Sequence, residues 1–225
     1  MFRIIRAATF AGVTLFVGAV AAQQAPAVIL AAAVAATQGA KTGYAFDFEF
    51  ETAKQNLRAR FNPGTTPHLQ PTAPRREEMS NEQRQAFDNI ARQMDGVSWC
   101  ASEQMGHVAS LRLLREDDAS ATYAFQPTPE SIRSEQARRF ANQLRGEVTL
   151  TKADPDISRV RLFAPAAFSP FPLVNITRFD AVIDCAAAPN GRRYAAQTVT
   201  EITGGAFGQN FDQRSVQRTR NLIAP

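Results

Sequence analysis

Hydrophobic and polar residues alternate along residues 44–51 and again along residues 56–61. A period of two sends successive side chains to opposite faces of an extended chain, so each segment is predicted to be a β-strand with one buried face. Only residues 52–55 separate the two segments, a length typical of a hairpin loop. The pattern therefore predicts an antiparallel hairpin early in the chain.

The side chains of this hairpin also select its register. One register places acidic residues of the first strand opposite arginines of the second and packs the apolar side chains of both strands together. The pairs in this register are Glu51 with Asn56, Phe50 with Leu57, Glu49 with Arg58, Phe48 with Ala59, Asp47 with Arg60 and Phe46 with Phe61. A slip by one residue would lose both sets of contacts, so we expect this register.

Three other segments have the pattern of helices. Residues 27–37 are an alanine-rich run with aliphatic residues between, and residues 81–94 repeat apolar residues on one helical face after a serine–glutamine capping box. Residues 129–145 follow a threonine–proline start signal and precede a glycine, which predicts a third helix. Residues 62–74 contain four prolines and are predicted to be a surface loop.

Most of the remaining chain has the pattern of strands joined by turns. These predicted strands are residues 107–114, 120–126, 147–152, 158–163, 173–185, 192–203 and 210–220. With the first hairpin they make eight or nine strands, enough for a strongly curved antiparallel sheet. The expected fold class is α+β, with the helices packed on the sheet.

The N-terminal residues are typical of an export signal. Residues 1–6 carry Arg3 and Arg6, and residues 7–22 carry no charge and end in small residues. The uncharged run is shorter than the roughly 20 residues of a membrane-spanning helix, so a retained anchor is the weaker alternative. We expect residues 1–22 to be a cleaved signal peptide and residues 23–225 to be one domain in the periplasm, without an integral membrane segment. The expected cleavage region has no cysteine for a lipid anchor.

Composition bears on the partners of the protein. The formal net charge is +4, and basic residues are interspersed with acidic ones, which gives no support to nucleic-acid binding. Sixteen phenylalanines stand against three tyrosines and one tryptophan, a bias that suits either an ordinary core or a cavity lined with non-polar rings. We expect a monomer.

The cysteines and histidines limit the chemistry of the chain. Cys100 and Cys185 are the only two cysteines, and in an oxidising compartment they would form either a disulfide or two buried free thiols. His68 and His107 lie in unrelated contexts, and the acidic turns lack the spacing of a calcium loop. We therefore expect no metal, no cofactor and no catalytic residue. A hydrolase assembled from residues distant in sequence is the least favoured class.

The order of elements resembles the LolA/LolB-like superfamily of bacterial periplasmic proteins. The segments that carry the resemblance are residues 44–51, 56–62 and 146–165, within an element order that spans roughly residues 26–222. The resemblance implies an unclosed half-barrel with helices on or across its concave face, around an apolar cavity that holds a lipid or the acyl chains of a lipoprotein. It assigns no functional residue to this chain.

These observations favour a non-enzymatic carrier with an apolar cavity. The candidate lining residues are the apolar side chains of the first two hairpins: Phe46, Phe48, Phe50, Leu57, Phe61, Leu111, Leu113, Tyr123 and Phe125. An ordinary core would have the same pattern. Phe163, Phe168 and Phe171 lie in a proline-broken apolar segment, which is a cavity rim, a loop packed on the sheet, or a contact for a partner. The alternative function is thus an envelope protein-interaction module that uses the loop around Phe168.

Overall fold

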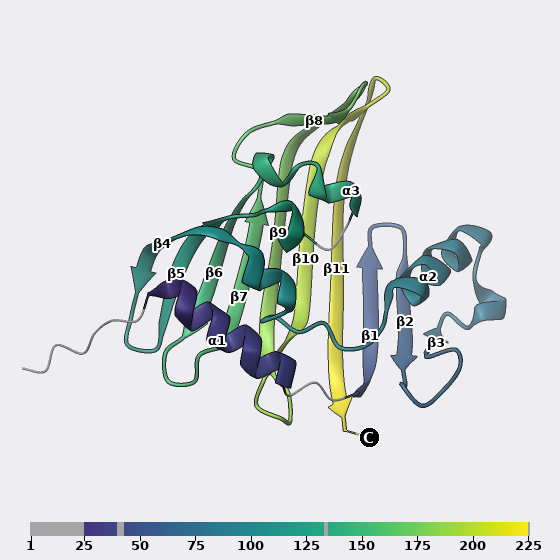
Figure 1. Ribbon diagram of the computed structural model, residues 1–225. Helices are drawn as coiled ribbons and strands as arrows, with labels where there is room; N and C mark the ends of the chain where they lie inside the picture. Colours follow the sequence, from purple (N-terminus) through teal and green to yellow (C-terminus); the bar gives the residue numbers. More distant parts are fainter. Residues whose placement is uncertain (1–24, 40–42, 133–134, 225) are drawn as a thin grey trace, which may run out of the picture.

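The computed structural model describes residues 25–39, 43–132 and 135–224, and the predicted signal peptide lies outside the described residues (Figure 1). One large antiparallel sheet carries short helices. The helices are α1 (Pro26–Gly39), α2 (Asn81–Gln93) and α3 (Glu135–Arg138), with 3-10 turns η1 (Arg76–Glu78), η2 (Glu103–His107), η3 (Pro129–Ser131) and η4 (Ala141–Gln143). The strands are β1 (Ala45–Thr52), β2 (Asn56–Phe61), β3 (Leu69–Ala73), β4 (Ala109–Glu116), β5 (Ser120–Gln126), β6 (Arg145–Thr151), β7 (Ile157–Phe163), β8 (Phe168–Phe171), β9 (Val174–Ala187), β10 (Arg193–Ala206) and β11 (Gln209–Ile223).

The sheet is open. Its strands follow the order β3-β2-β1-β11-β10-β9-β7-β6-β5-β4, and β8 pairs with β9 outside this path. All neighbours run antiparallel, and β3 and β4 form the two edges. The α+β class and the antiparallel sheet are confirmed. The sheet has 11 strands, more than the eight or nine expected.

The first hairpin forms with the predicted register. Each of the six pairs expected between β1 and β2 is present. Arg60 donates a 2.7 Å charged hydrogen bond to Asp47, and Phe46 stacks on Phe61 with 4.7 Å between ring centroids. Glu49 lies opposite Arg58, and its carboxylate also lies 3.9 Å from Arg218 on β11. Polar and apolar contacts together hold this register, as the alternation indicated.

Two segments with prolines are strands and not the irregular loops that we expected. Residues 69–73 form edge strand β3, and residues 168–171 form β8. Both strands lie outside the central part of the sheet and pair with one neighbour. A proline such as Pro71 is tolerated there because its missing N–H group is not needed to bond a second neighbouring strand. Proline content correctly excluded central strands, but it did not exclude edge strands.

The third predicted helix is wrong. Among the described residues of 129–145, the 3-10 turns η3 and η4 and the four-residue helix α3 replace one long helix. Their apolar residues Ile132, Ala141 and Leu144 are buried and pack near Ala164 and Phe179. Burial of these side chains against the sheet thus stabilises a bent path that helix propensity alone does not predict.

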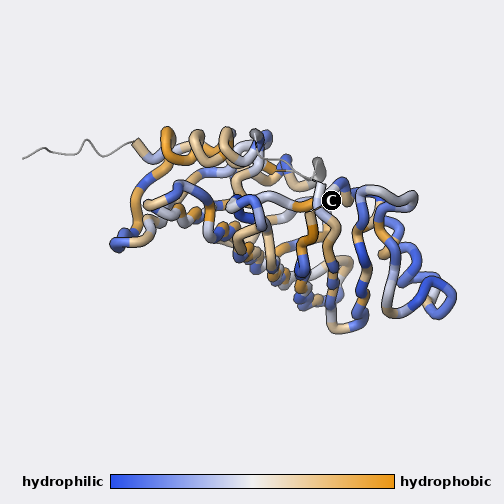
Figure 2. Tube along the Cα trace, turned by 90° about the horizontal axis from the view of Figure 1, so that it is seen from below, coloured by the Kyte–Doolittle hydropathy of each residue, from blue (hydrophilic) through white to orange (hydrophobic). Residues whose placement is uncertain are grey.

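One face of the sheet carries the core of the protein. Directly opposed residues of an antiparallel ladder lie on the same face. An unbroken row of such pairs crosses the sheet through Phe50, Gln217, Thr198, Ile183, Val160, Val148 and Tyr123. Helix α1 packs on this face against β5–β7 through Leu30 and Ala33, and α2 packs on it against β1–β3 through Phe87. Figure 2 shows α1 lying across one side of the sheet, whose strands alternate between hydrophobic and hydrophilic positions.

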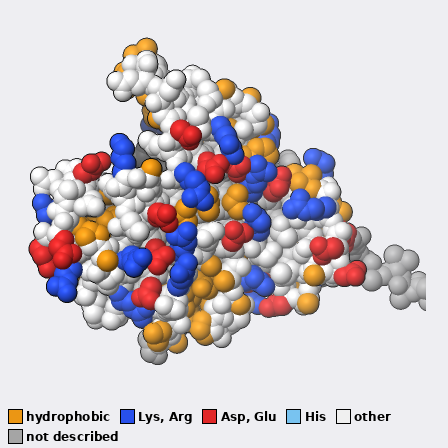
Figure 3. Space-filling view, turned by 180° about the vertical axis from the view of Figure 1, so that it is seen from behind, with side chains coloured by type: hydrophobic (Ala, Val, Ile, Leu, Met, Phe, Trp, Pro, Cys, Tyr) orange, Lys and Arg blue, Asp and Glu red, His pale blue; other side chains and the backbone are white. Residues whose placement is uncertain are grey.

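The opposite face of the sheet is charged. Its ion pairs include Arg161 with Asp180 at 2.7 Å, and Glu201 shared by Arg178 at 2.9 Å and Arg214 at 3.6 Å. Figure 3 shows this face, where acidic and basic side chains are mixed. Exposed pairs of this kind contribute little stability, typically under about 1 kcal/mol each, so their effect is to keep this face in solvent.

Gly146 on β6 is predicted to be irreplaceable while Phe125 is present. A Cβ atom at Gly146 would lie 2.1 Å from the ring of Phe125, which is directly opposite on β5. We expect Gly146→Ala to lower the free energy of unfolding by about 1–3 kcal/mol because the buried ring must move. In urea denaturation, Phe125→Ala should cost much less in the Gly146→Ala protein than in the wild type; additive effects would contradict the predicted clash.

Candidate functional site

Strands β10 and β11 separate near the lower end of the sheet in Figure 1, the end at which α1 lies. β10 and β11 pair from Gln197 and Arg218 upward, whereas the last residues of β11 pair only with β1. Residues 98–100, here called the strap, take the free edge of β10. Ala195 donates a 2.8 Å backbone hydrogen bond to Ser98, and Cys100 donates one of 3.0 Å to Arg193. The strap thus lies where the sheet opens.

Two cavities flank the strap on the helix-covered face. The α2 cavity, about 210 Å³, lies between α2 and strands β1, β10 and β11. Its lining includes Phe46, Phe48, Ile90, Met94, Thr198 and Thr219. The η2 cavity, also about 210 Å³, lies between the strap, η2 and strands β5, β7 and β9. Its lining includes Cys100, Met105, Phe125, Ile132, Val160 and Ile183. Ser98 and Ala195 line both cavities, so the two adjoin at the strap.

The η2 cavity is mainly apolar, and the α2 cavity is lined by a mixture of apolar and polar residues. No charged side chain and no histidine lines the η2 cavity. The α2 cavity has one charged side chain in its lining, Asp95. Polar groups at the α2 cavity come from neutral residues such as Thr198 and Gln217. A surface without charge favours hydrocarbon, which needs contact area and no hydrogen-bond partner. This arrangement can hold an apolar ligand.

The size of the cavities limits what can occupy them. Each is smaller than the roughly 300–1,000 Å³ typical of pockets for drug-sized ligands, whereas the two together reach that range. A ligand of that size would have to pass the strap and occupy both. Ala195, whose side chain is a single methyl group, lies at this junction together with Ser98.

The predicted lining residues divide among several places. Phe46 and Phe48 line the α2 cavity, and Phe125 lines the η2 cavity. Phe61 lines a third and more polar pocket of about 490 Å³ beside Trp99. The remaining apolar candidates belong to the core or its margin: Phe50, Leu57, Leu111 and Tyr123. Leu113 lies on edge strand β4 and is 44% exposed.

The predicted rim residues lie on different elements. Phe163 is on β7, with the guanidinium of Arg161 over its ring at 4.8 Å. Phe168 and Phe171 are on β8 and both pack against Phe140, at 5.7 Å and 6.0 Å between ring centroids. Phe163 therefore belongs to the charged face, and the two phenylalanines of β8 form a small aromatic cluster with Phe140.

Several cavity residues have no signal in the sequence. The strap and η2 contribute Trp99, Cys100 and Met105, which lie between predicted elements. Their place depends on pairing with residues 193–195, far along the chain. The one available clue was the cysteine pair, since a bond to residue 185 would bring residue 100 to the sheet.

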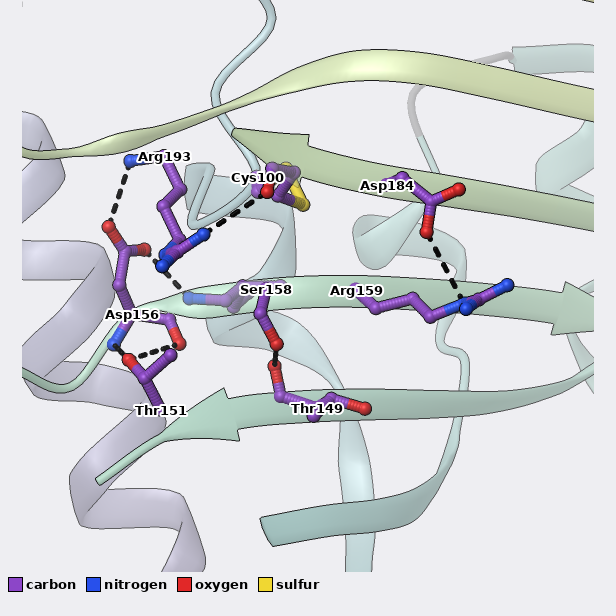
Figure 4. Close-up of a disulfide and its surroundings, with 10 residues drawn as sticks. Cys100, Thr149, Thr151, Asp156, Ser158, Arg159, Asp184 and Arg193 are labelled. Carbon is purple, nitrogen blue, oxygen red and sulfur yellow. Dashed lines mark hydrogen bonds and ion pairs between the residues drawn. A yellow bond between two sulfur atoms is a disulfide. The ribbon is translucent and has the colours of Figure 1, made fainter. Parts of the chain in front are cut away.

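Cys100 and Cys185 form a disulfide with an S–S distance of 2.05 Å, which resolves the two alternatives in favour of the bond (Figure 4). The bond joins the strap to β9 across a sequence separation of 85 residues. Cys185 lies opposite Ala195 on β10, and Ala195 lines both cavities. The disulfide thus fastens the segment that separates the two cavities.

A buried carboxylate lies near the disulfide (Figure 4). Asp156 is 2% exposed and accepts hydrogen bonds from the backbone amides of Ile157 at 2.7 Å and Arg193 at 2.9 Å. Arg193 in turn donates from its guanidinium to the carbonyl of Cys185. Burial raises the pKa of Asp156, and the two amide hydrogen bonds partly oppose this rise. The carboxylate joins the β6–β7 turn to the first residue of β10.

We expect Asp156→Ala to destabilise the protein by about 2 kcal/mol or more, because two backbone amides lose their acceptor. The pH dependence should also change. Since the folded state holds the Asp156 proton more tightly than the unfolded chain, its contribution to stability falls as the pH rises from the ordinary carboxyl pKa through the raised one. Thermal unfolding measured across this pH range should show this loss of stability with rising pH in the wild type and not in Asp156→Ala. Equal pH profiles would contradict the assignment.

Other chemical groups do not converge on the cavities. His68 packs beside Phe61, and the carbonyl of His107 accepts from the hydroxyl of Thr128. Across the described residues, no group of three or more His, Cys, Asp or Glu side chains is arranged to hold a metal ion. No helix within the same residues is both long and apolar enough to cross a membrane.

Comparisons of the chain with protein-family models, with curated proteins and with solved structures found no match. Function therefore has to be argued from the site and its chemistry.

Proposed function

We propose that the protein is an exported, periplasmic carrier that binds an apolar ligand, a lipid or the acyl chain of a lipoprotein, without covalent chemistry. In this proposal the open sheet is the half-barrel of a LolA/LolB-like protein, and α1, α2 and the strap cover its concave face. The observation that carries the proposal is the pair of adjoining cavities, which meet at Ala195 and contain one charged side chain between them.

The position of the cavities supports a ligand that enters from one side. The α2 cavity lies at the end of the β10–β11 ladder: Gln217 is still opposite Thr198, whereas Thr219 lies past the last pair, where β11 is paired with β1. Neutral polar residues such as Gln217 and Thr219 lie here, where a lipid headgroup or a carboxyl end can remain hydrated. The η2 cavity has no such residues on its sheet wall and suits the distal hydrocarbon.

The alternative function, a protein contact through the loop around Phe168, has less support. Phe168 and Phe171 pack against Phe140, which accounts for part of their apolar surface within the fold. Residues 168–171 are also held as a strand by β9 and are not a free loop. A selective loss of a co-purified protein after Phe168→Ser, with ligand binding unchanged, would favour this alternative.

The test of the proposal is direct ligand binding. The protein is stripped of bound lipid by an organic-solvent wash on a hydrophobic resin and titrated with a fluorescent long-chain fatty acid. We expect saturable binding of one acyl chain, displaced by unlabelled fatty acid and unaffected by salt, because the cavities are apolar. A short polar analogue serves as the control. Absence of saturable binding would contradict the proposal.

A further inference from the structure

Three long strands extend beyond the rest of the sheet and end in an exposed apolar tip. β9, β10 and β11 each have 14 or 15 residues, and they rise with β8 above the other strands (Figure 1). The tip consists of the β8–β9 turn with Leu173 and the β10–β11 turn with Phe207. These are the two most exposed large hydrophobic side chains among the described residues, at 74% and 76%.

Both residues occupy backbone positions that disfavour them. Leu173 follows Pro172 in a two-residue turn and has a φ of 65°. Phe207 and Gly208 form the other two-residue turn, with φ values of 52° for Phe207 and 80° for Gly208. Glycine or asparagine is preferred at such positive-φ turn positions. The turns are tied together by a 3.0 Å backbone hydrogen bond from Phe207 to Leu173. The fold thus holds large apolar side chains outward where a small polar residue would be easier to accommodate, which indicates a role outside the fold.

The tip also lacks charge to a defined depth. Residues 162–177 and 202–211 contain no Asp, Glu, Lys or Arg. The first charges on β9 and β11 are Arg178 and Asp212, which lie at one level because both face Thr203 on β10. Four uncharged residues of β9 precede that level, a depth of about 13 Å at roughly 3.3 Å per residue. In Figure 3 charged side chains begin below the uppermost part of the molecule.

We propose that this tip inserts into the surface of a lipid bilayer. Interfacial helices enter the headgroup and acyl boundary by roughly 5–10 Å, and to that depth strands β8–β11 carry no charge of their own. Leucine and phenylalanine are among the side chains that enter hydrocarbon most favourably. The charges at the boundary balance, since Glu201 pairs with both Arg178 and Arg214 and Asp212 lies beside them. Binding therefore needs no anionic lipid.

A second protein is a poorer occupant of the tip. Stable protein interfaces bury about 800 Å² on each partner, and the residues that contribute most of their binding energy are enriched in Tyr, Trp and Arg. The two turns offer few large side chains, among them Phe171, Leu173 and Phe207, and none of those three residue types. A bilayer needs neither complementary shape nor a minimum contact area. This inference does not depend on what the cavities bind.

The test replaces both residues with asparagine. Leu173→Asn with Phe207→Asn places a favoured residue at each positive-φ position, and the second change creates an Asn–Gly turn. The variant should therefore unfold at the wild-type temperature or above it. We expect the wild type to float with phosphatidylcholine vesicles at low and high salt, and the variant to partition about tenfold less or weaker still.

The matched control is Leu113→Thr with Leu114→Thr, which removes two exposed leucines from edge strand β4 and should float like the wild type. Several results would overturn the proposal. They are a wild type that stays unbound, an asparagine variant that binds equally well, and binding that requires anionic vesicles and disappears in salt. Self-association of the wild type without vesicles, lost in the asparagine variant, would also overturn it in favour of a protein contact.

Discussion

Replacing Ala195 with phenylalanine is expected to abolish acyl-chain binding while the protein stays folded. Ala195 lines both cavities at their junction, where an extended ligand must pass the strap. The added ring is the size of benzene, which an apolar cavity of about 150 Å³ accommodates, so it would fill most of one 210 Å³ cavity. We expect affinity for a long-chain fatty acid to fall by tenfold or more. The ring occupies existing space, so the loss of stability should not exceed about 1–3 kcal/mol.

The control for this change is Ala124→Phe. Ala124 lies on β5 opposite Glu147, on the charged face, so it adds the same ring away from both cavities. This variant should bind the fatty acid like the wild type. Calorimetric titration of the three proteins gives the affinities, and thermal unfolding checks the fold. Wild-type affinity in Ala195→Phe would show that the ligand, if any, binds elsewhere.

Removal of the disulfide is expected to have the largest effect on stability. A bond that closes an 85-residue loop stabilises the folded state by about 4–5 kcal/mol when the effect is attributed to chain entropy. Cys100→Ala with Cys185→Ala should therefore unfold on the order of 10 °C lower than the wild type. Treatment of the wild type with a reducing agent should give the same unfolding temperature, which separates the lost bond from the effect of the alanines.

The disulfide also bears on the cavities. Without it, the strap is held to β10 by two backbone hydrogen bonds and can leave the sheet more readily. We expect faster release of a bound fatty acid from the double alanine variant at a temperature where it is still folded. Unchanged unfolding and release would mean that the strap is held by its packing alone, against the structural role inferred for the bond.

The fold could be predicted from the sequence where two physical constraints acted on the same residues. In the first hairpin, apolar alternation and opposite charges select one register, and that register is present. The prediction was wrong where one constraint was used alone. Prolines suggested loops at residues 69–73 and 168–171, but an edge strand tolerates proline because one side of it needs no donor. Start and stop signals suggested a helix at residues 129–145, but packing against the sheet favours short turns.

The candidate site could be predicted only in part for a related reason. Phe46, Phe48 and Phe125 lie on predicted strands whose alternation showed which face they occupy. The strap has no periodic pattern, because its position depends on pairing with residues nearly a hundred positions away. The division between β10 and β11 is also missed by the sequence pattern, because it depends on local irregularities: β10 has a bulge between Ala195 and Gln197, and Asn221 of β11 has φ 53°. Cavities arise from such long-range arrangements.

The most direct measurement of the central claim is mass spectrometry of the intact folded protein, purified without detergent from its own compartment. We expect a population carrying one apolar adduct that dissociates in organic solvent and is identified in the extract as a lipid or fatty acid. The adduct should be absent from Ala195→Phe purified in the same way. A wild-type protein that carries no adduct and takes up no fatty acid when one is supplied would contradict the carrier function.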